Sequence, residues 1–326
     1  MSSDFPKVAV LLAAYNGKAW IEEQLASIFA QTGVNLSIYI SVDPSTDGTE
    51  ALCAEYALRH ANVVLLPPAG PFKGAARNFF RLIRDVDFST YDFVSFSDQD
   101  DIWYPDKLQR AVAKLRSDDI DGYSSNVIAF WPNGRRMLVD KAQPQVKWDH
   151  LFEAAGPGCT YVLKPALAAG FKQLIVEQWE RVQEVALHDW FCYAFARSHG
   201  FKWFIDPVPG MDYRQHKSNE VGVNSGFGSA LKRVKRIFGG WWRSQIRTVG
   251  ALVCSDREPL ALSIPVAKYS PFNLLLNARQ CRRRRRDQLA FVLICLGYLF
   301  TSNRTDGASD DELQSKNVHS ENGKVR

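Results

Sequence analysis

The chain has 326 residues, of which 46% are hydrophobic and 23% are charged. These values are typical of a globular protein with one large domain and an appended segment. Six scattered cysteines show no Cys-x-x-Cys pair and no His/Cys ligand spacing, which excludes a zinc site and favours reduced thiols in a cytosolic protein. The start of the chain lacks the basic region of a signal peptide, and the apolar run 289–300 is too short to span a bilayer.

The charge is unevenly distributed, although the formal net charge is only +5. Residues 1–225 carry 22 Lys and Arg against 27 Asp and Glu, whereas residues 226–300 carry 14 against 3. A strongly basic segment attached to an acidic body requires an anionic partner, such as a membrane surface, a nucleic acid or an anionic substrate.

Strands and helices are predicted to alternate along the first part of the chain, because apolar runs are followed by apolar residues at helical spacing. The predicted strands cover residues 7–15, 35–43, 61–68 and 91–101, and the predicted helices cover residues 19–33, 49–60, 74–86 and 105–117. This alternation predicts an α/β fold with a doubly wound, mostly parallel, Rossmann-like sheet. Ligands of such sheets bind beyond the carboxyl ends of the strands, where Tyr15, Asp43 and Asp98 fall.

The middle of the chain continues the mixed pattern less regularly. A strand is predicted over residues 122–130, and helices are predicted over 165–178 and 188–200. A further strand and a turn rich in Pro and Gly are predicted within residues 202–216. The loop 131–157 shows no pattern that indicates chemistry.

Residues 223–300 form the basic segment, and its first part is predicted to be amphipathic. One helical face collects Leu231, Val234, Phe238, Trp241, Trp242, Ile246 and Val249. Basic residues border this face, as is typical of a helix on a membrane surface. Five arginines, Arg282–Arg286, precede the apolar run and repeat the pattern. The sequence leaves open whether the segment binds a membrane, covers the α/β domain or forms a dimer contact. Residues 301–326 are predicted to be a disordered tail.

Three carboxylates, Asp98, Asp100 and Asp101, follow a predicted buried strand within four residues of one another. Their mutual repulsion and desolvation are costly unless a cation or hydrogen bonds compensate. One interpretation is a site for Mg²⁺ or Mn²⁺, held by carboxylates and by the phosphates of a substrate. The alternative is that these side chains cap neighbouring turns.

Two later motifs also carry candidate residues. Asp189 follows His188 at the start of a predicted helix, where a carboxylate is either stabilised by the helix dipole or acts as a general base. Arg214 and His216 lie in a loop after a strand, where they predict a diphosphate or metal contact.

These motifs, taken together and in this order, resemble the inverting glycosyltransferases of family 2, especially the rhamnosyltransferase-like branch. The resemblance covers about residues 6–222. The matching stretches are "LLAAYNG" (11–17), "STDGT" (45–49), "GAARNF" (74–79), "FSDQDDIWYPDKL" (96–108), "GCTYVL" (158–163), "HDWF" (188–191) and "YRQHKSNEVG" (213–222).

The resemblance implies a GT-A fold in residues 1–222 and an activity. The enzyme is expected to transfer a sugar, with inversion, from a nucleotide-diphospho-sugar to a hydroxyl of a saccharide or lipid-linked saccharide. Mg²⁺ or Mn²⁺ is the expected cofactor, and cell-surface polysaccharide synthesis is the expected process. The protein is expected in the cytoplasm, peripheral on the inner face of the membrane through residues 229–300.

Residue by residue, the resemblance implies three sets of roles. Asp189 matches the catalytic base. The metal is expected on Asp98, Asp100 and His216. The nucleotide sugar is expected on Ala14, Tyr15, Asp43, Asn78, Asp98, Gln99 and Arg214. One position departs from the family pattern: relatives often have two acids before the Ser-x-Asp-Gly loop, and here Val42 replaces the first. The departure leaves the base of the donor nucleotide undetermined.

Two other functions are compatible with parts of the sequence. A non-catalytic sugar-nucleotide binder would share the fold, although the chain retains both the Asp-x-Asp motif and Asp189. A nucleic-acid-binding protein would use Arg282–Arg286 on phosphates. The interleaved tryptophans favour a membrane over nucleic acid, and no RNA-binding signature is present. We therefore expect no nucleic-acid partner, and the oligomeric state is not predicted.

Overall fold

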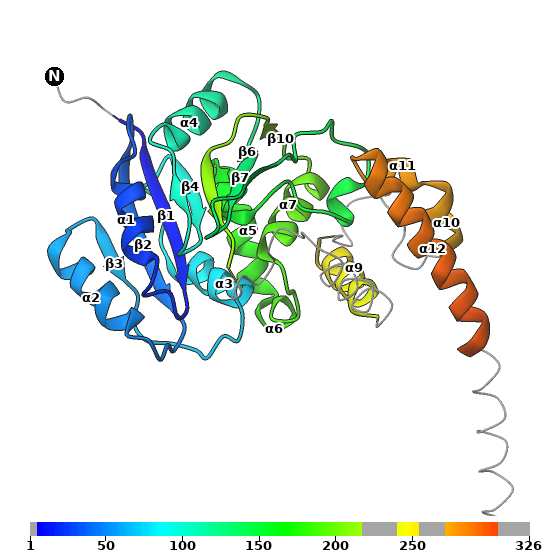
Figure 1. Cartoon of the computed structure of the whole chain (residues 1–326), viewed down its shortest axis with the longest axis horizontal. Coiled ribbons are helices and arrows are strands. Elements are labelled where there is room, and N and C mark those ends of the chain that lie inside the picture. Colours follow the sequence, from blue (N-terminus) through cyan, green and yellow to red (C-terminus); the bar gives the residue numbers. More distant parts are fainter. Residues whose placement is uncertain (1–4, 217–239, 254–270, 306–326) are drawn as a thin grey trace, which may run out of the picture.

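A computed structural model of the chain describes residues 5–216, 240–253 and 271–305. Its centre is a seven-stranded sheet with the order β10-β6-β9-β4-β1-β2-β3, covered by helices (Figure 1). Only β9 (Val162–Leu163) runs antiparallel to its neighbours in this sheet. The parallel strands are β1 (Lys7–Ala14), β2 (Asn35–Val42), β3 (Val63–Leu65), β4 (Phe93–Ser97), β6 (Gly122–Ser125) and β10 (Trp203–Asp206). The predicted doubly wound, mostly parallel α/β fold is thus confirmed.

Strand β1 shows why the sequence forms this sheet. Its residues from Val8 to Ala14 are all buried, and both of its neighbours, β2 and β4, run parallel to it. Ala9, Leu11 and Ala13 point into one core, whereas the alternate residues point into the core on the opposite face. Helices on both faces of a parallel sheet require such a continuous apolar strand.

The helices divide between the two faces of the sheet. One core contains α1 (Ile21–Phe29), α2 (Thr49–Arg59) and α4 (Lys107–Ser117). The other contains α3 (Ala75–Asp85), α5 (Pro165–Glu177) and α7 (His188–Ser198), with the short α6 (Trp179–Val182) beside them. The predicted helices 74–86, 105–117, 165–178 and 188–200 all form, with ends that shift by only one or two residues.

The predicted strand 122–130 is wrong as a single element. Strand β6 ends at Ser125, and β7 (Val127–Phe130) joins a second sheet of order β5-β11-β7-β8. The buried Asn126 separates them, because its side-chain amide donates to the Pro207 carbonyl and to Asp140. The other strands of the second sheet are β5 (Ile102–Trp103), β8 (Arg136–Val139) and β11 (Met211–Arg214). The second sheet carries β11 to the carboxyl end of β4.

The C-terminal helices pack on the α/β body, where α9 (Trp241–Val253) lies next to α7 (Figure 1). Trp242, Ile246 and Val249 are buried in the same core as α3 and α7. This part of the apolar face predicted to lie on a membrane is therefore covered by protein. Its residues 231–238 lie outside the described part of the chain, as does the boundary predicted at residue 222.

The remaining helices form a hairpin beyond α9. They are α10 (Pro271–Leu276), α11 (Ala278–Cys281) and α12 (Arg285–Thr305). Phe291, Cys295 and Tyr298 bury one face of α12, whose far end leads away from the body (Figure 1). Within residues 5–216, 240–253 and 271–305, the structure holds no helix with the length and apolar character needed to span a membrane. The tail predicted to be disordered lies mostly outside the described residues.

Candidate active site

A cleft of about 1750 Å³ lies at the carboxyl ends of β1, β2 and β4. Ligand pockets commonly have volumes of about 300–1000 Å³, so this cleft has room for two substrates side by side. The residues lining it include most of those predicted from the sequence: Ala14, Tyr15, Asp43, Asn78, Asp98, Gln99, Asp100, Asp189 and His216. They come from distant parts of the chain, and the sheet brings them together.

Asp100 and His216 are in direct contact, although 116 residues separate them in the chain. The His216 Nε2 atom lies 2.6 Å from the Asp100 carboxylate, and the Trp20 ring stacks on the imidazole with a centroid distance of 4.0 Å. Asp98 lines the same cleft two residues earlier. Two carboxylates and an imidazole suit Mg²⁺ or Mn²⁺, with the nitrogen ligand favouring Mn²⁺. The chemistry of these donor groups therefore fits the predicted cation, and Asp100 and His216 are the two that lie in direct contact.

Asp101 is separate from this set and lies beneath it. Its side chain is fully buried with Cys159, whose thiol hydrogen-bonds to it, and the Arg214 backbone N–H donates to its Oδ1 at 3.2 Å. Burial, together with the charges of Asp100 and Asp98, raises the pKa of Asp101 well above its usual value. Burial also raises the pKa of the Cys159 thiol. Asp98, Asp101 and Cys159 lie within metal-ligand spacing of one another, but Asp101 and Cys159 are fully buried and hydrogen-bonded to each other, and a thiol is a poor ligand for a hard cation, so we interpret this cluster as structural.

Lys107 supplies the buried positive charge nearest to this cluster. Its ammonium lies 3.3 Å from the centre of the Trp103 ring and 3.5 Å from the Ser95 hydroxyl. Burial lowers the pKa of Lys107 to about 7, against the opposing effects of Cys159 and Asp101. The stretch "DDIWYPDKL" thus contributes both the buried Asp101 and the buried Lys107 directly after the strand that leads to Asp98.

Four of the predicted nucleotide-sugar residues are tied together by hydrogen bonds at the ends of β1 and β2. The Gln99 amide pairs with the Tyr15 backbone, accepting from its N–H and donating to its carbonyl, both at 2.8 Å. The Asn78 amide donates to the carbonyls of Ala14 and Ser41. Gln99 and Asn78 therefore shape the cleft floor through their amides, while the Tyr15 side chain is 55% exposed at its edge.

Asp43 holds a neighbouring loop. Its two carboxylate oxygens accept the backbone N–H groups of Phe72 at 2.8 Å and Lys73 at 3.1 Å. Val42, the position that departs from the family pattern, is buried in the core. The carboxylate predicted to contact the nucleotide thus also fixes the loop that forms one wall of the cleft.

Arg214 contacts the backbone of the Asp-x-Asp stretch. Its Nε donates to the Asp100 carbonyl at 2.8 Å, and its guanidinium also pairs with Glu23. The side chain is only 17% exposed. The structure thus places Arg214 next to Asp100, with its fork engaged by protein groups, and Arg214 is not among the residues that line the cleft, so its predicted contact with the donor stays a prediction.

Asp189 enters the cleft at the first turn of α7, where the helix dipole favours a carboxylate. His188 beside it is buried, and its ring stacks on Phe79 with a centroid distance of 3.8 Å. Burial lowers the pKa of His188 to about 3, so the imidazole is neutral at physiological pH. A Cβ atom on Gly158 would lie 2.4 Å from His188 Nε2 and 3.1 Å from Asp189 Cβ. The glycine of "GCTYVL" therefore allows this pair to reach its place.

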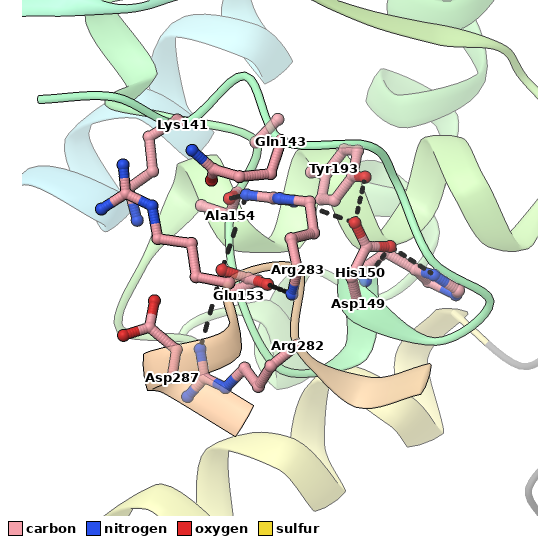
Figure 2. A network of polar contacts seen from close by, with 12 residues as sticks. Lys141, Gln143, Asp149, His150, Glu153, Ala154, Tyr193, Arg282, Arg283 and Asp287 are labelled. Carbon is pink, nitrogen blue, oxygen red and sulfur yellow. Dashed lines mark hydrogen bonds and ion pairs between the residues drawn. The ribbon is translucent and has the colours of Figure 1, made fainter. Parts of the chain in front are cut away.

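The wall opposite the strand ends was not foreseen, because it combines the loop 131–157 with the arginine run. Arg283 is fully buried, 2.9 Å from Asp149 and 3.6 Å from Glu153 (Figure 2). Asp149 also accepts from Arg197 and from the Tyr193 hydroxyl. Burial alone would raise the pKa of Asp149, but its contacts with His150 and the two arginines lower it below the usual value. The sequence offered one signal for this network: the loop 131–157 contains the acids Asp149 and Glu153, and the run Arg282–Arg286 contains the arginines that can pair with them.

The geometry supports two chemical tasks in one cleft. Asp98, Asp100 and His216 offer ligands for a cation and, through it, for phosphates. The Asp189 carboxylate, from a different element, can accept a proton from a second substrate. A donor with a phosphate leaving group and a nucleophilic acceptor would occupy the two parts.

Comparisons with known proteins agree with this arrangement. The sequence model of Glycosyl transferase family 2 matches residues 9–170. The dTDP-rhamnosyl transferase RfbG of Shigella flexneri is 43% identical over 292 residues, which span 89% of this chain and 100% of that protein. The putative glycosyltransferase EpsE of Bacillus subtilis is 28% identical over 145 residues, spanning 43% of this chain and 51% of EpsE.

A solved structure supports the fold. The crystal structure of S. aureus TarS 1-349 in complex with UDP has a TM-score of 0.54 and 14% sequence identity, and the match covers 84% of this chain and 71% of that one. At this identity, the similarity shows only the shared GT-A architecture. With the long match to RfbG, it leads to the conclusion that this chain belongs to glycosyltransferase family 2 and is a GT-A enzyme of the rhamnosyltransferase-like kind.

Proposed function

We propose that this enzyme transfers rhamnose from dTDP-rhamnose to a hydroxyl of a saccharide acceptor, with inversion and with Mg²⁺ or Mn²⁺. The identity of the donor rests on the 43% identity to the dTDP-rhamnosyl transferase RfbG over nearly the whole chain. The chemistry rests on one observation: Asp189 and the contacting pair Asp100 and His216 line the same cleft.

The residues of the chain divide the reaction between them. Asp98, Asp100 and His216 would hold the cation, which when bound neutralises charge on the departing nucleoside diphosphate. Asp189 accepts the proton of the acceptor hydroxyl while its oxygen attacks the anomeric carbon. Attack from the side opposite to the leaving group inverts the configuration at that carbon. Trp190 and Phe191 are buried behind Asp189 and limit the access of water from that side.

The acceptor is proposed to be a growing polysaccharide chain, linked to a lipid at the cytosolic face of the membrane. Exposed apolar side chains on α10 and α12, among them Phe272, Leu276, Leu289 and Leu293, support this position. Arg285 and Arg286 are exposed at the start of α12, where they would meet anionic headgroups.

The test is the binding and hydrolysis of UDP-, GDP- and dTDP-sugars by the purified protein with Mg²⁺, Mn²⁺ or EDTA. We expect metal-dependent binding of dTDP-rhamnose, loss of that binding in Asp100→Asn, and retained binding in Asp189→Asn with turnover reduced by roughly 10²–10⁴-fold. Asp106→Asn, a surface change at the start of α4, serves as the matched control.

Two results would contradict the proposal. If no nucleotide sugar binds under any metal condition, the carboxylate set has only a structural role. If Asp189→Asn turns over like the unaltered enzyme, the general base is another group.

A further inference from the structure

The cleft extends beyond the residues of the proposed reaction, and its far wall is cationic. This wall contains Lys141, which follows β8, Arg284, which precedes α12, and Arg285 and Arg286, which begin α12. None of these comes from the strand ends that carry Asp98, Asp100 and His216. The wall is therefore built by different elements from those of the proposed donor site.

The buried network fixes the position of this wall. Arg283 donates to the Ala154 carbonyl at 2.7 Å and to Asp149 at 2.9 Å, and its backbone N–H donates to Glu153 at 2.8 Å (Figure 2). Its side chain is 0% exposed. Because Arg283 is held through both backbone and side chain, the three arginines that follow it, and with them the start of α12, have a fixed place in the cleft.

Positive charge exceeds negative charge on this wall. Lys141 and the five arginines Arg282–Arg286 are six cations, and the carboxylates beside them are Asp140, Asp149, Glu153 and Asp287. One of these four, Asp149, is shared with Arg197. Among the described residues, neither Lys141 nor Arg285 forms an ion pair. An anion bound in the cleft would compensate this excess.

The pKa of Lys141 reflects the same excess of positive charge. Burial lowers the pKa of its ammonium, and Arg283 and Arg282 lower it further against the opposing effect of Glu153. A cluster of like charges that is kept together in a cleft costs free energy unless a ligand of opposite charge binds there. Arginine forks match the tetrahedral oxygens of phosphate especially well.

We propose that Lys141, Arg284, Arg285 and Arg286 form an acceptor-side anion subsite that binds the phosphate or diphosphate ester of a phosphorylated saccharide acceptor. The inference rests on the proposed function, because the bound ester would hold the acceptor hydroxyl toward Asp189. Trp241 and Trp242, which line the cleft beside this wall, offer apolar surface to the part of the acceptor next to the phosphate.

The test is a calorimetric titration of the full chain with octyl diphosphate below its critical micelle concentration, in EDTA so that the donor cation is absent. Arg285 and Arg286 are exposed, so the double variant Arg285→Ala/Arg286→Ala should fold. We expect its affinity for octyl diphosphate to fall by about tenfold or more, because charge-assisted hydrogen bonds are lost. The double lysine variant should recover part of the affinity.

Arg279→Ala is the matched control, since Arg279 is exposed on the same hairpin and outside the residues lining the cleft. Equal affinity in the double alanine variant and the unaltered chain would overturn the proposal, as would an equal loss in Arg279→Ala. Binding of galacturonate without binding of diphosphate would also overturn it, because the subsite would then select a carboxylate.

Two further measurements distinguish a soluble from a lipid-linked phosphate ester, and a failure of the anion subsite from a failure of the proposed donor. Inorganic diphosphate that binds as tightly as octyl diphosphate indicates a soluble phosphorylated acceptor, whereas tighter binding of the octyl ester indicates a lipid-linked one. Metal-dependent binding of dTDP-rhamnose is measured on the same preparations. If diphosphate binds in EDTA and no nucleotide sugar binds with metal, the donor assignment fails and the subsite stands. If a nucleotide sugar binds with metal and diphosphate does not bind in EDTA, only the subsite is overturned.

Discussion

Gly158 has no room for a side chain, because His188 and the proposed base Asp189 occupy the space where its Cβ would point. The distances from that Cβ position are 2.4 Å to His188 Nε2 and 3.1 Å to Asp189 Cβ. His188 cannot retreat, since its ring is buried against Phe79. Gly158 therefore acts by leaving room for Asp189 at its position, and has no side chain that could take part in the chemistry.

We therefore expect Gly158→Ala to lower kcat by roughly tenfold to a hundredfold, the cost of displacing a catalytic group by about 1 Å. Steady-state kinetics with dTDP-rhamnose would measure it. Gly134→Ala is the control, because a Cβ there meets nothing within 4 Å, although its positive φ adds some strain. A Gly158→Ala enzyme with unchanged kcat would show that the start of α7 adjusts freely.

His188 also makes the stability of the fold depend on pH. Burial lowers its pKa from 6.5 to about 3, so below pH 6.5 the unfolded chain binds a proton that the native protein does not. The free energy of unfolding therefore falls as the pH falls from about 6.5 toward 3. Between pH 7 and pH 5 this group alone should account for a loss of roughly 2 kcal/mol.

The measurement is urea unfolding of the native chain and of His188→Asn at both pH values. The variant is expected to lose roughly 2 kcal/mol less than the native chain over this interval, whatever its stability at pH 7. His199→Asn, at the exposed residue that follows the end of the same helix, should follow the native chain. Parallel losses in all three proteins would place the protonating group elsewhere.

Helix α12 is joined to the α/β body by ion pairs as well as by apolar packing. Arg283, just before the helix, lies between Asp149 and Glu153 with no exposed side-chain surface. Removing one partner of a buried ion pair commonly costs about 3–5 kcal/mol, and the loss of Arg283 would leave Asp149 with Arg197 and Glu153 with the more distant Arg282. We expect Arg283→Met to lower the free energy of unfolding by that amount, measured by urea denaturation.

A double variant tests the pairing itself. Arg283→Met/Asp149→Asn should be less destabilised than the sum of the two single variants, because the second change removes the buried carboxylate that Arg283→Met leaves with Arg197 as its one remaining arginine partner. Arg279→Met, at an exposed position on α11, controls for the loss of an arginine as such. Additive effects in the double variant would mean that Arg283 and Asp149 do not stabilise each other.

At the level of elements, the local pattern predicted most helices and the central strands, and it failed where two neighbouring strands enter different sheets. Residues 122–130 are predicted as one strand from the local sequence, yet the chain changes sheet at Asn126. That change depends on the Pro207 carbonyl and Asp140, which are distant in the sequence. Side-chain periodicity carries no information about such a partner.

Taken as a whole, the molecule has an acidic α/β body and a basic helical hairpin with exposed leucines. The apolar face of α9 that was predicted to bind a membrane packs on the α/β domain. By contrast, Leu289 and Leu293 on α12 are 67% and 68% exposed. If the protein binds membranes through α12, it should cosediment with vesicles that contain phosphatidylglycerol and much less with phosphatidylcholine alone.

Leu289→Asp/Leu293→Asp should weaken that cosedimentation by more than about tenfold, since the burial of two leucine side chains is lost. Leu58→Asp is the control, because Leu58 is 89% exposed on α2. Unchanged vesicle binding in the α12 variant would exclude this face as the membrane contact.

The sequence by itself determined the order of strands and helices and the placement of acidic motifs at strand ends, because these follow from local periodicity and chain order. The family resemblance grouped Asp100 with His216, but the tertiary structure decided that the two side chains are in direct contact across 116 residues. It also decided that the arginine run turns inward to form a wall of the cleft, with Arg283 buried. Both depend on long-range packing and charge pairing, for which the local sequence has no signature.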